Sequence, residues 1–225
     1  LARGDAASVI FFGGFLVLVV VREMTLGRPG EDPRWGRGLV WTGLFFSLIL
    51  AEPELGRAAF LLPVSAGILW CAGTPARVLA WLGGLSAAAV PVGYVFMMEY
   101  QRKRILNFLN PEQDAPGAGY NLGQSKIAIG AGGLLGKGWG HGSQTQYQFI
   151  PEKHTDFIFS VIGEEWGFAG CFLIVLLVFA IMAVGLGYAR EARDEGGSLL
   201  AAGLSLLVVL EALVNMGMTV GLLPV

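Results

Sequence analysis

The feature that most constrains this chain is a series of six apolar segments with almost no charged residues. They lie at roughly residues 6–21, 39–51, 56–72, 78–98, 168–188 and 199–223. Crossing about 30 Å of hydrocarbon takes about 20 helical residues. Lipid offers no partners to free backbone groups, so such segments must span a membrane as helices. They also lack the polar stripe that a soluble bundle would need. The sequence therefore predicts an all-α polytopic membrane protein.

The composition supports membrane insertion and excludes several other classes. The chain is 54% hydrophobic and 14% charged, whereas globular proteins carry about 25% charged residues. A net charge of −2 gives no electrostatic support for a nucleic-acid partner. Cys71 and Cys171 lie in apolar runs and imply neither a disulfide nor a metal site. Because the chain starts at Leu1 without a signal pattern, we expect a longer protein, truncated here at both ends.

Arginine placement predicts the orientation of these helices. If the segments alternate across the membrane, one side receives Arg22, Arg28, Arg34, Arg37, Arg77, Arg190 and Arg193. The other side has a single arginine, Arg57, in its one short loop. Short loops rich in Lys and Arg face the cytoplasm. We therefore predict four transmembrane segments in 1–98, a large extracellular loop in 99–167, and two further segments in 168–225.

The predicted outer loop contains a basic cluster and a glycine-rich run. Arg102, Lys103 and Arg104 follow the fourth span, where they could contact lipid headgroups or bind a pyrophosphate. Seven glycines lie between Gly130 and Gly142, a density that permits close backbone approach to a ligand. The run does not match a nucleotide-binding P-loop. We expect it to line a cavity.

The stretch "PEKHTDFIFSVIGEEWGF" (151–168) gathers ionisable residues just before an apolar run. Thr155 or Asp156 could cap the N-terminus of a helix. A zinc site formed by His141, Glu152, His154 and Asp156 is a second interpretation, but the spacing fits no standard ligand pattern. In the third, Asp156 is a general base whose pKa is tuned by partial desolvation. Composition alone does not decide between them.

The sequence from Tyr100 to Gly170, including "KGWGHGSQTQYQFIPEKHTDFIF", closely resembles the large outer loop of the SEDS (shape, elongation, division and sporulation) family. It is closer to the RodA branch than to FtsW. The flanking "AEPELGR" and "NMGMTVGLLPV" are weaker matches. The resemblance implies a fragment of a ten-helix fold in the bacterial inner membrane, with these six segments as its fourth to ninth helices.

The resemblance also implies an activity. SEDS proteins are peptidoglycan glycosyltransferases that polymerise lipid II, with a class B penicillin-binding protein as transpeptidase partner. The family's catalytic aspartate, in its His-Thr-Asp-Phe motif, corresponds to Asp156. We assign the stabilisation of the departing pyrophosphate to the cations of Arg102, Arg104 and Lys126, with Mg²⁺ or Mn²⁺ as a candidate cofactor. Residues at other motif positions are further candidates for substrate binding. The full predicted substrate-binding set is Arg102, Arg104, Gln124, Ser125, Lys126, His154 and Glu165.

The sequence departs from the family pattern at several places, and other functions stay open. The acidic and lysine positions of the fourth family helix correspond to Asp5 and Ser8, and the Gln-Pro-Asp-Leu-Gly-Thr turn reads Glu52, Pro53, Glu54 and ends in Arg57. These changes alter the charge expected in the cavity. A transporter of lipid-linked precursors and a non-catalytic scaffold for a transpeptidase are the alternatives. Only the enzyme requires a carboxylate at residue 156.

Overall fold

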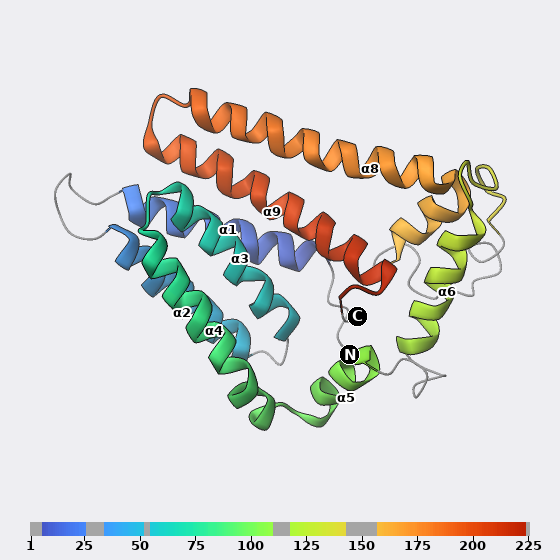
Figure 1. Ribbon diagram of the computed structural model, residues 1–225. Helices are drawn as coiled ribbons and strands as arrows, with labels where there is room; N and C mark the ends of the chain where they lie inside the picture. Colours follow the sequence, from blue (N-terminus) through green and yellow to red (C-terminus); the bar gives the residue numbers. More distant parts are fainter. Residues whose placement is uncertain (1–5, 26–33, 52–54, 110–117, 143–156, 224–225) are drawn as a thin grey trace. The chain divides into compact units, whose positions relative to one another are not determined.

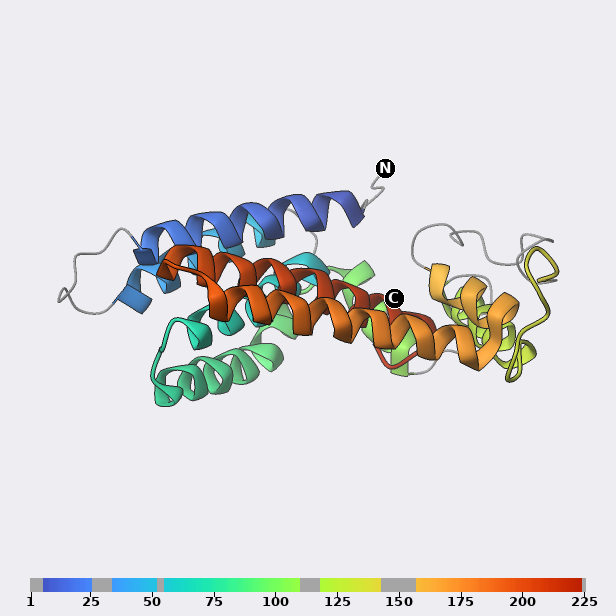
Figure 2. The same cartoon turned by 90° about the horizontal axis from the view of Figure 1, so that it is seen from above.

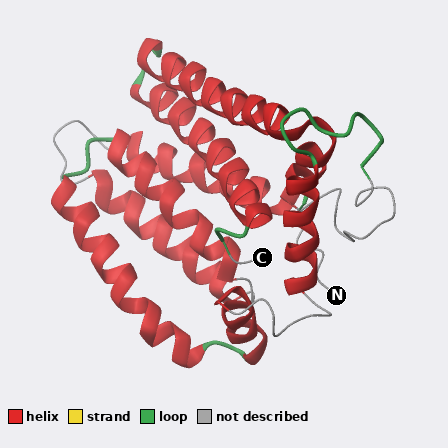
Figure 3. Cartoon of the chain, turned by 45° about the vertical axis from the view of Figure 1, so that its right-hand side comes forward, coloured by secondary structure: helices red, strands yellow, loops and turns green. Residues whose placement is uncertain are grey.

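The computed structural model describes residues 6–25, 34–51, 55–109, 118–142 and 157–223. Within these ranges every regular element is a helix (Figure 3). The elements are α1 (Ala6–Thr25), α2 (Arg34–Ala51), α3 (Leu55–Cys71), α4 (Ala76–Phe96), α5 (Glu99–Leu109), α6 (Ala118–Ala131), α8 (Ile158–Glu191) and α9 (Glu195–Val220). A helix thus covers each of the six apolar segments.

Three helices are long and apolar enough to cross a membrane: Ala76–Val95, Ile158–Glu191 and Glu195–Val220. Many of their large apolar side chains are exposed, for example Trp81 on α4 and Phe179 on α8. On helices that cross a membrane, such exposed apolar side chains contact the lipid chains. In the part of the chain that the structure describes, α1, α2 and α3 do not meet the same length and hydropathy criteria, so their crossing stays a prediction.

The chain divides into two compact units. The first comprises Leu1–Val95 and Ile181–Leu210. In it α1, α2 and α3 pack together, and the end of α8 runs antiparallel to the first half of α9 (Figures 1 and 2). Its core includes the fully buried Leu16, Val64 and Ile68. Gly203 of α9 lies so close to Val17 and Ile68 that an added Cβ would approach Val17 Cγ1 to 2.8 Å.

The second unit comprises Phe96–Ala180 and Glu211–Val225 and contains nearly all the predicted site residues. Helices α5 and α6 contact each other, and a loop from Gly132 to Gly142 follows α6. Helix α8 is broken at Gly167, whose φ of 66° and ψ of −160° are not helical. The break separates a short helix, Ile158–Trp166, from the long apolar helix that begins at Phe168.

Candidate functional site

The glycine-rich loop after α6 binds directly to the break in α8. The amides of Lys137 and Gly138 donate to the carbonyls of Glu164 and Glu165, each at 3.0 Å. On the other side of the break, the amides of Phe168 and Ala169 donate to the carbonyls of Gly133 and Leu134, at 2.9 and 3.1 Å. A helix break leaves such groups without their usual partners. The loop supplies four of these partners and so stabilises the break.

This docking requires glycine at the points of closest approach. A Cβ on Gly136 would overlap the Glu165 carbonyl, and one on Gly167 would overlap the Gly136 amide and lie 2.8 Å from Leu134 O. The conformation at Gly167 is also essentially restricted to glycine. The sequence analysis predicted close backbone approach to a ligand by this run. In the described residues, the close approach is to the chain's own backbone.

A salt bridge reinforces the same contact. Lys137 Nζ lies 2.9 Å from Glu164 Oε1, and the Glu164 side chain is fully buried while that of Lys137 is 30% exposed. An unpaired buried carboxylate would be strongly unfavourable. The lysine therefore allows Glu164 to remain charged inside the protein. Sequence reasoning did not predict this pair, because its members lie 27 residues apart.

Ser125, a predicted substrate-binding residue, is fully buried at the junction of three helices. Its hydroxyl donates to Thr219 O on α9 at 2.7 Å. Ser160 Oγ on α8, also fully buried, lies 2.6 Å from Ser125 Oγ. Since the Ser125 proton is directed to Thr219, Ser160 is the donor in that second bond. The hydroxyls connect α6, α8 and α9, and substrate contact by Ser125 stays a prediction.

The predicted cationic residues of this unit lie on two helices that contact each other. Lys126 on α6 is exposed, and its ammonium lies against Gly221, where an added Cβ would be 2.7 Å from Nζ. Gly221 follows the C-terminus of α9, the negative end of the helix dipole, which favours a cation. Arg102 is half-buried on α5, and Gln124 is half-buried on α6. Arg104 is also on α5, but its side chain lies outside the described residues.

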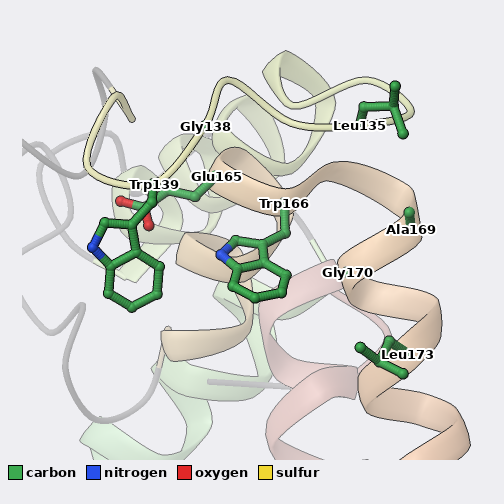
Figure 4. Close-up of a pocket in the computed structure, with 8 residues that line it drawn as sticks. All are labelled: Leu135, Gly138, Trp139, Glu165, Trp166, Ala169, Gly170 and Leu173. Atoms are coloured by element: carbon green, nitrogen blue, oxygen red, sulfur yellow. The ribbon is translucent and has the colours of Figure 1, made fainter.

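Glu165 lines a pocket of about 350 Å³ beside the docked loop. Figure 4 shows the Trp139 and Trp166 indoles side by side, with the Glu165 carboxylate drawn at the Trp139 indole. The two indole rings meet edge to face, with centroids 6.2 Å apart. The rest of the lining is formed by Leu135, Gly138, Ala169, Gly170 and Leu173. The pocket therefore combines one acidic group and two aromatic rings with an apolar wall.

Asp156 and His154 lie outside the described residues, as do Asp5, Glu52 and Glu54. The structure does describe Phe157, which directly follows Asp156. Its side chain is buried and packs with Ala128 of α6, and its carbonyl accepts the Ser160 amide at 3.0 Å. The chain is thus anchored one residue after the predicted base. Ser8 and Arg57 lie in α1 and α3, but their side chains are not described.

Among the described residues no group of three or more His, Cys, Asp or Glu side chains could hold a metal ion. His141, named in the zinc interpretation, is exposed. Its Nδ1 lies 2.9 Å from Trp139 O. A carbonyl only accepts, so Nδ1 carries the proton. The predicted Mg²⁺ or Mn²⁺ has no ligand cluster in this part of the chain.

Comparison with known proteins decides the family. The model of the cell cycle protein family that includes FtsW, RodA and SpoVE matches residues 10–225. The chain belongs to this family. Its SEDS relatives include the peptidoglycan glycosyltransferase MrdB of Escherichia coli, 42% identical over 179 residues, which cover 79% of this chain and 48% of MrdB. Another is stage V sporulation protein E of Bacillus subtilis, 35% identical over 91% of this chain and 54% of that protein.

A probable peptidoglycan glycosyltransferase FtsW of Trichlorobacter lovleyi is 43% identical over 80% of the chain and 47% of its own length. The chain therefore spans about half the length of the curated SEDS relatives that it matches. A solved structure described as showing the coordination of polymerization and crosslinking by a peptidoglycan synthase complex aligns with a TM-score of 0.74 at 26% identity. That alignment covers 93% of this chain and 58% of the solved one. The protein is thus a fragment of a polytopic helical SEDS membrane protein.

Proposed function

We propose that the whole protein is a peptidoglycan glycosyltransferase that polymerises lipid II for cell-wall elongation. The observation that supports this most strongly is the identity of 42% to MrdB, which is named a peptidoglycan glycosyltransferase. The predicted resemblance to the RodA branch favours elongation over division. The comparisons cover about half of each relative, so the proposal extends from the shared region to the whole molecule.

In this proposal Asp156 is the general base. Its carboxylate takes the proton of the 4-hydroxyl of the acceptor sugar. The hydroxyl oxygen then forms a bond to the anomeric carbon of the second chain. The bond between that carbon and the pyrophosphate oxygen breaks, and polyprenyl pyrophosphate leaves with the electron pair. A positioned base of this kind contributes typically 10²–10⁴-fold to a rate.

The leaving pyrophosphate requires positive charge, which we assign to Arg102, Arg104 and Lys126. Two features support this: the first two residues lie on α5 and the third on α6, and these helices contact each other. Preorganised cations stabilise charge that develops in the transition state. Gln124, His154 and Glu165 are proposed to contact the sugars or the peptide. A divalent cation would neutralise phosphate charge, but the described residues offer it no ligand cluster, so the reaction is written without it.

We further propose an inner-membrane location with residues 99–167 outside the cytoplasm. The arginine distribution supports this orientation. Lipid II presents its sugars to the outer face, where the glycine-rich loop and Asp156 would then lie. The proposed partner is a class B penicillin-binding protein. In support, the similar solved structure comes from a complex that combines polymerization with crosslinking.

The test is polymer synthesis from purified lipid II by the full-length protein, co-purified with its transpeptidase. Asp156→Asn keeps the size of the side chain and removes the base. We expect loss of glycan polymer with an intact complex, whereas Asp114→Asn, in the same predicted outer loop, should retain activity. Polymer made at the normal rate by Asp156→Asn would remove this residue from the mechanism.

The two alternative functions give different results in the same preparation. A transporter would move lipid II across vesicles without making polymer, and Asp156→Asn would leave that movement unchanged. A scaffold would bind the transpeptidase and leave lipid II unaltered in both wild type and variant. A wild-type protein that makes no polymer would therefore reject the enzyme, whatever the variant does.

A further inference from the structure

The surface beside the helix break is unusually apolar for a loop that is assigned to the water-facing side. Leu134 is 76% exposed, Leu135 82% and Trp139 78%. Trp166 and Phe168 on α8 are also exposed, at 48% and 63%. These five side chains come from two segments that are joined by backbone hydrogen bonds. We call these five exposed side chains the loop–break face.

The backbone hydrogen bonds fix the level of the loop along α8. Ala169 N donates to Leu134 O, which places Leu134 beside the first turn of the long apolar helix. Gly138 N donates to Glu165 O, which places the chain next to Trp139 beside the acidic pair Glu164–Glu165. The loop is therefore held on both sides of the break, and the Trp166 side chain itself lies against Gly170 in the first turn of the long helix.

These contacts place the loop–break face beside the outer end of a helix that is long enough to cross a bilayer. The apolar helix from Phe168 to Glu191 has 24 residues and is roughly 36 Å long, enough for about 30 Å of hydrocarbon. Its first turn therefore lies at the edge of the hydrocarbon. The side chains packed around this turn, Trp166 among them, therefore lie at the boundary between hydrocarbon and headgroups, where tryptophan is enriched because its ring is apolar and its N–H is polar.

We infer that the loop Gly132–Gly142 is seated in the membrane itself, with lipid as the occupant of the loop–break face. The five side chains of the loop–break face lie at the boundary between headgroups and hydrocarbon, and the pocket lined by Trp139 and Trp166, shown in Figure 4, opens to lipid through Leu135, Ala169 and Leu173. This inference rests on the fold and does not depend on the enzymatic activity.

The charges of the loop agree with this placement. Lys137 lies between the leucines and Trp139 in sequence, yet its ammonium turns inward to Glu164 at 2.9 Å. The loop amides at Lys137 and Gly138 are bonded to α8. The loop can therefore approach lipid without carrying these polar groups into the hydrocarbon, where each one without a partner would be costly.

Collision accessibility of nitroxide labels tests the inference. The full-length protein, with its native cysteines replaced by alanine, is reconstituted alone into phosphatidylcholine–phosphatidylglycerol vesicles. Labels are attached in the single variants Leu134→Cys, Leu135→Cys and Trp139→Cys. Oxygen concentrates in the bilayer, and an uncharged nickel chelate stays in water. Phe172→Cys serves as the lipid reference and Arg193→Cys as the water reference, since both positions are exposed.

We expect the ratio of oxygen to nickel accessibility at residues 134 and 135 to lie clearly above that at 193. Residue 139 should fall between the two references. A ratio at 134 and 135 equal to that at 193 would show a loop in water and overturn the inference. If neither reagent reaches these labels, or if both accessibilities collapse when the transpeptidase is added, the face binds protein and the inference is wrong.

Discussion

Replacing Gly167 by alanine should undo the docking of the glycine-rich loop, because the structure makes this residue the point of closest approach. The residue has a φ of 66° and a ψ of −160°, a conformation that costs a non-glycine residue about 1–3 kcal/mol. The new Cβ would also overlap the Gly136 amide and lie 2.8 Å from Leu134 O. Backbone atoms cannot rotate away as a side chain could, so the loop must move.

The size of the effect follows from what that movement breaks. Four backbone hydrogen bonds join the loop to α8, and each contributes about 1 kcal/mol to stability. With the conformational term, the total destabilisation on loss of all four bonds lies between about 5 and 7 kcal/mol. At roughly 2 °C or more for each kcal/mol, the apparent Tm of the full-length protein should fall by at least about 10 °C.

The assay is thermal unfolding of the detergent-solubilised full-length protein, followed by the fraction that still elutes as a monodisperse peak. Gly133→Ala is the matched control in the same loop, since its φ is 55° but no atom lies within 4 Å of its added Cβ. It should be destabilised by only about 1 kcal/mol. Gly130→Ala, in α6 with open space around it, should be stabilised by about 0.5–1 kcal/mol. If Gly167→Ala unfolds at the same temperature as Gly133→Ala, the close approach described above is wrong.

Three further substitutions test other parts of the site. Lys137→Met should destabilise the protein by roughly 2 kcal/mol, less than for a fully buried pair because Lys137 is 30% exposed. Adding Glu164→Gln should restore part of this loss, as measured by thermal unfolding. Additive effects in the double variant would contradict a direct interaction between the two side chains. Ser125→Ala should cost about 1–3 kcal/mol because it leaves Thr219 O without its bond, whereas the exposed Ser47→Ala should have little effect; a raised KM for lipid II at unchanged stability would instead assign Ser125 to the substrate. Arg102→Gln should lower the polymerisation rate about 10²-fold if this cation stabilises the pyrophosphate. Lys103→Gln on the same helix should not lower the rate. Equal losses in the two variants would indicate that both cations only attract the protein to the membrane surface.

The sequence predicted the helices well because each is encoded locally. Apolar runs of sufficient length have no stable alternative to helix in lipid, and the helices α1 to α4, α8 after Gly167 and α9 follow those runs. The helices α5 and α6 lie in the predicted outer loop and were not predicted. The predicted start of the fifth span, residue 168, coincides with the residue after the break at Gly167. The helical character of Ile158–Trp166 was less apparent, because it precedes that span in a stretch rich in ionisable residues.

The contacts of the site could not be predicted, because they join distant parts of the chain. Ser125 bonds to residues 35 and 94 positions away, and a single sequence contains no signal for such pairs. Glycine density correctly indicated close backbone approach but not what is approached. The importance assigned to Glu165 came from a family motif, whereas its neighbours Trp139 and Trp166 were not recognised as a pair.

The hydrogen bonds on both sides of Gly167 fix the angle between the two helices that meet at this flexible residue. An isolated glycine would let the short helix Ile158–Trp166 swing against the long helix that follows. Here any swing must stretch the loop's bonds to Glu164 and Glu165 or those to Phe168 and Ala169. The axis of the short helix therefore keeps a constant direction relative to the first turns of the long helix. Its tilt can change only when the loop detaches.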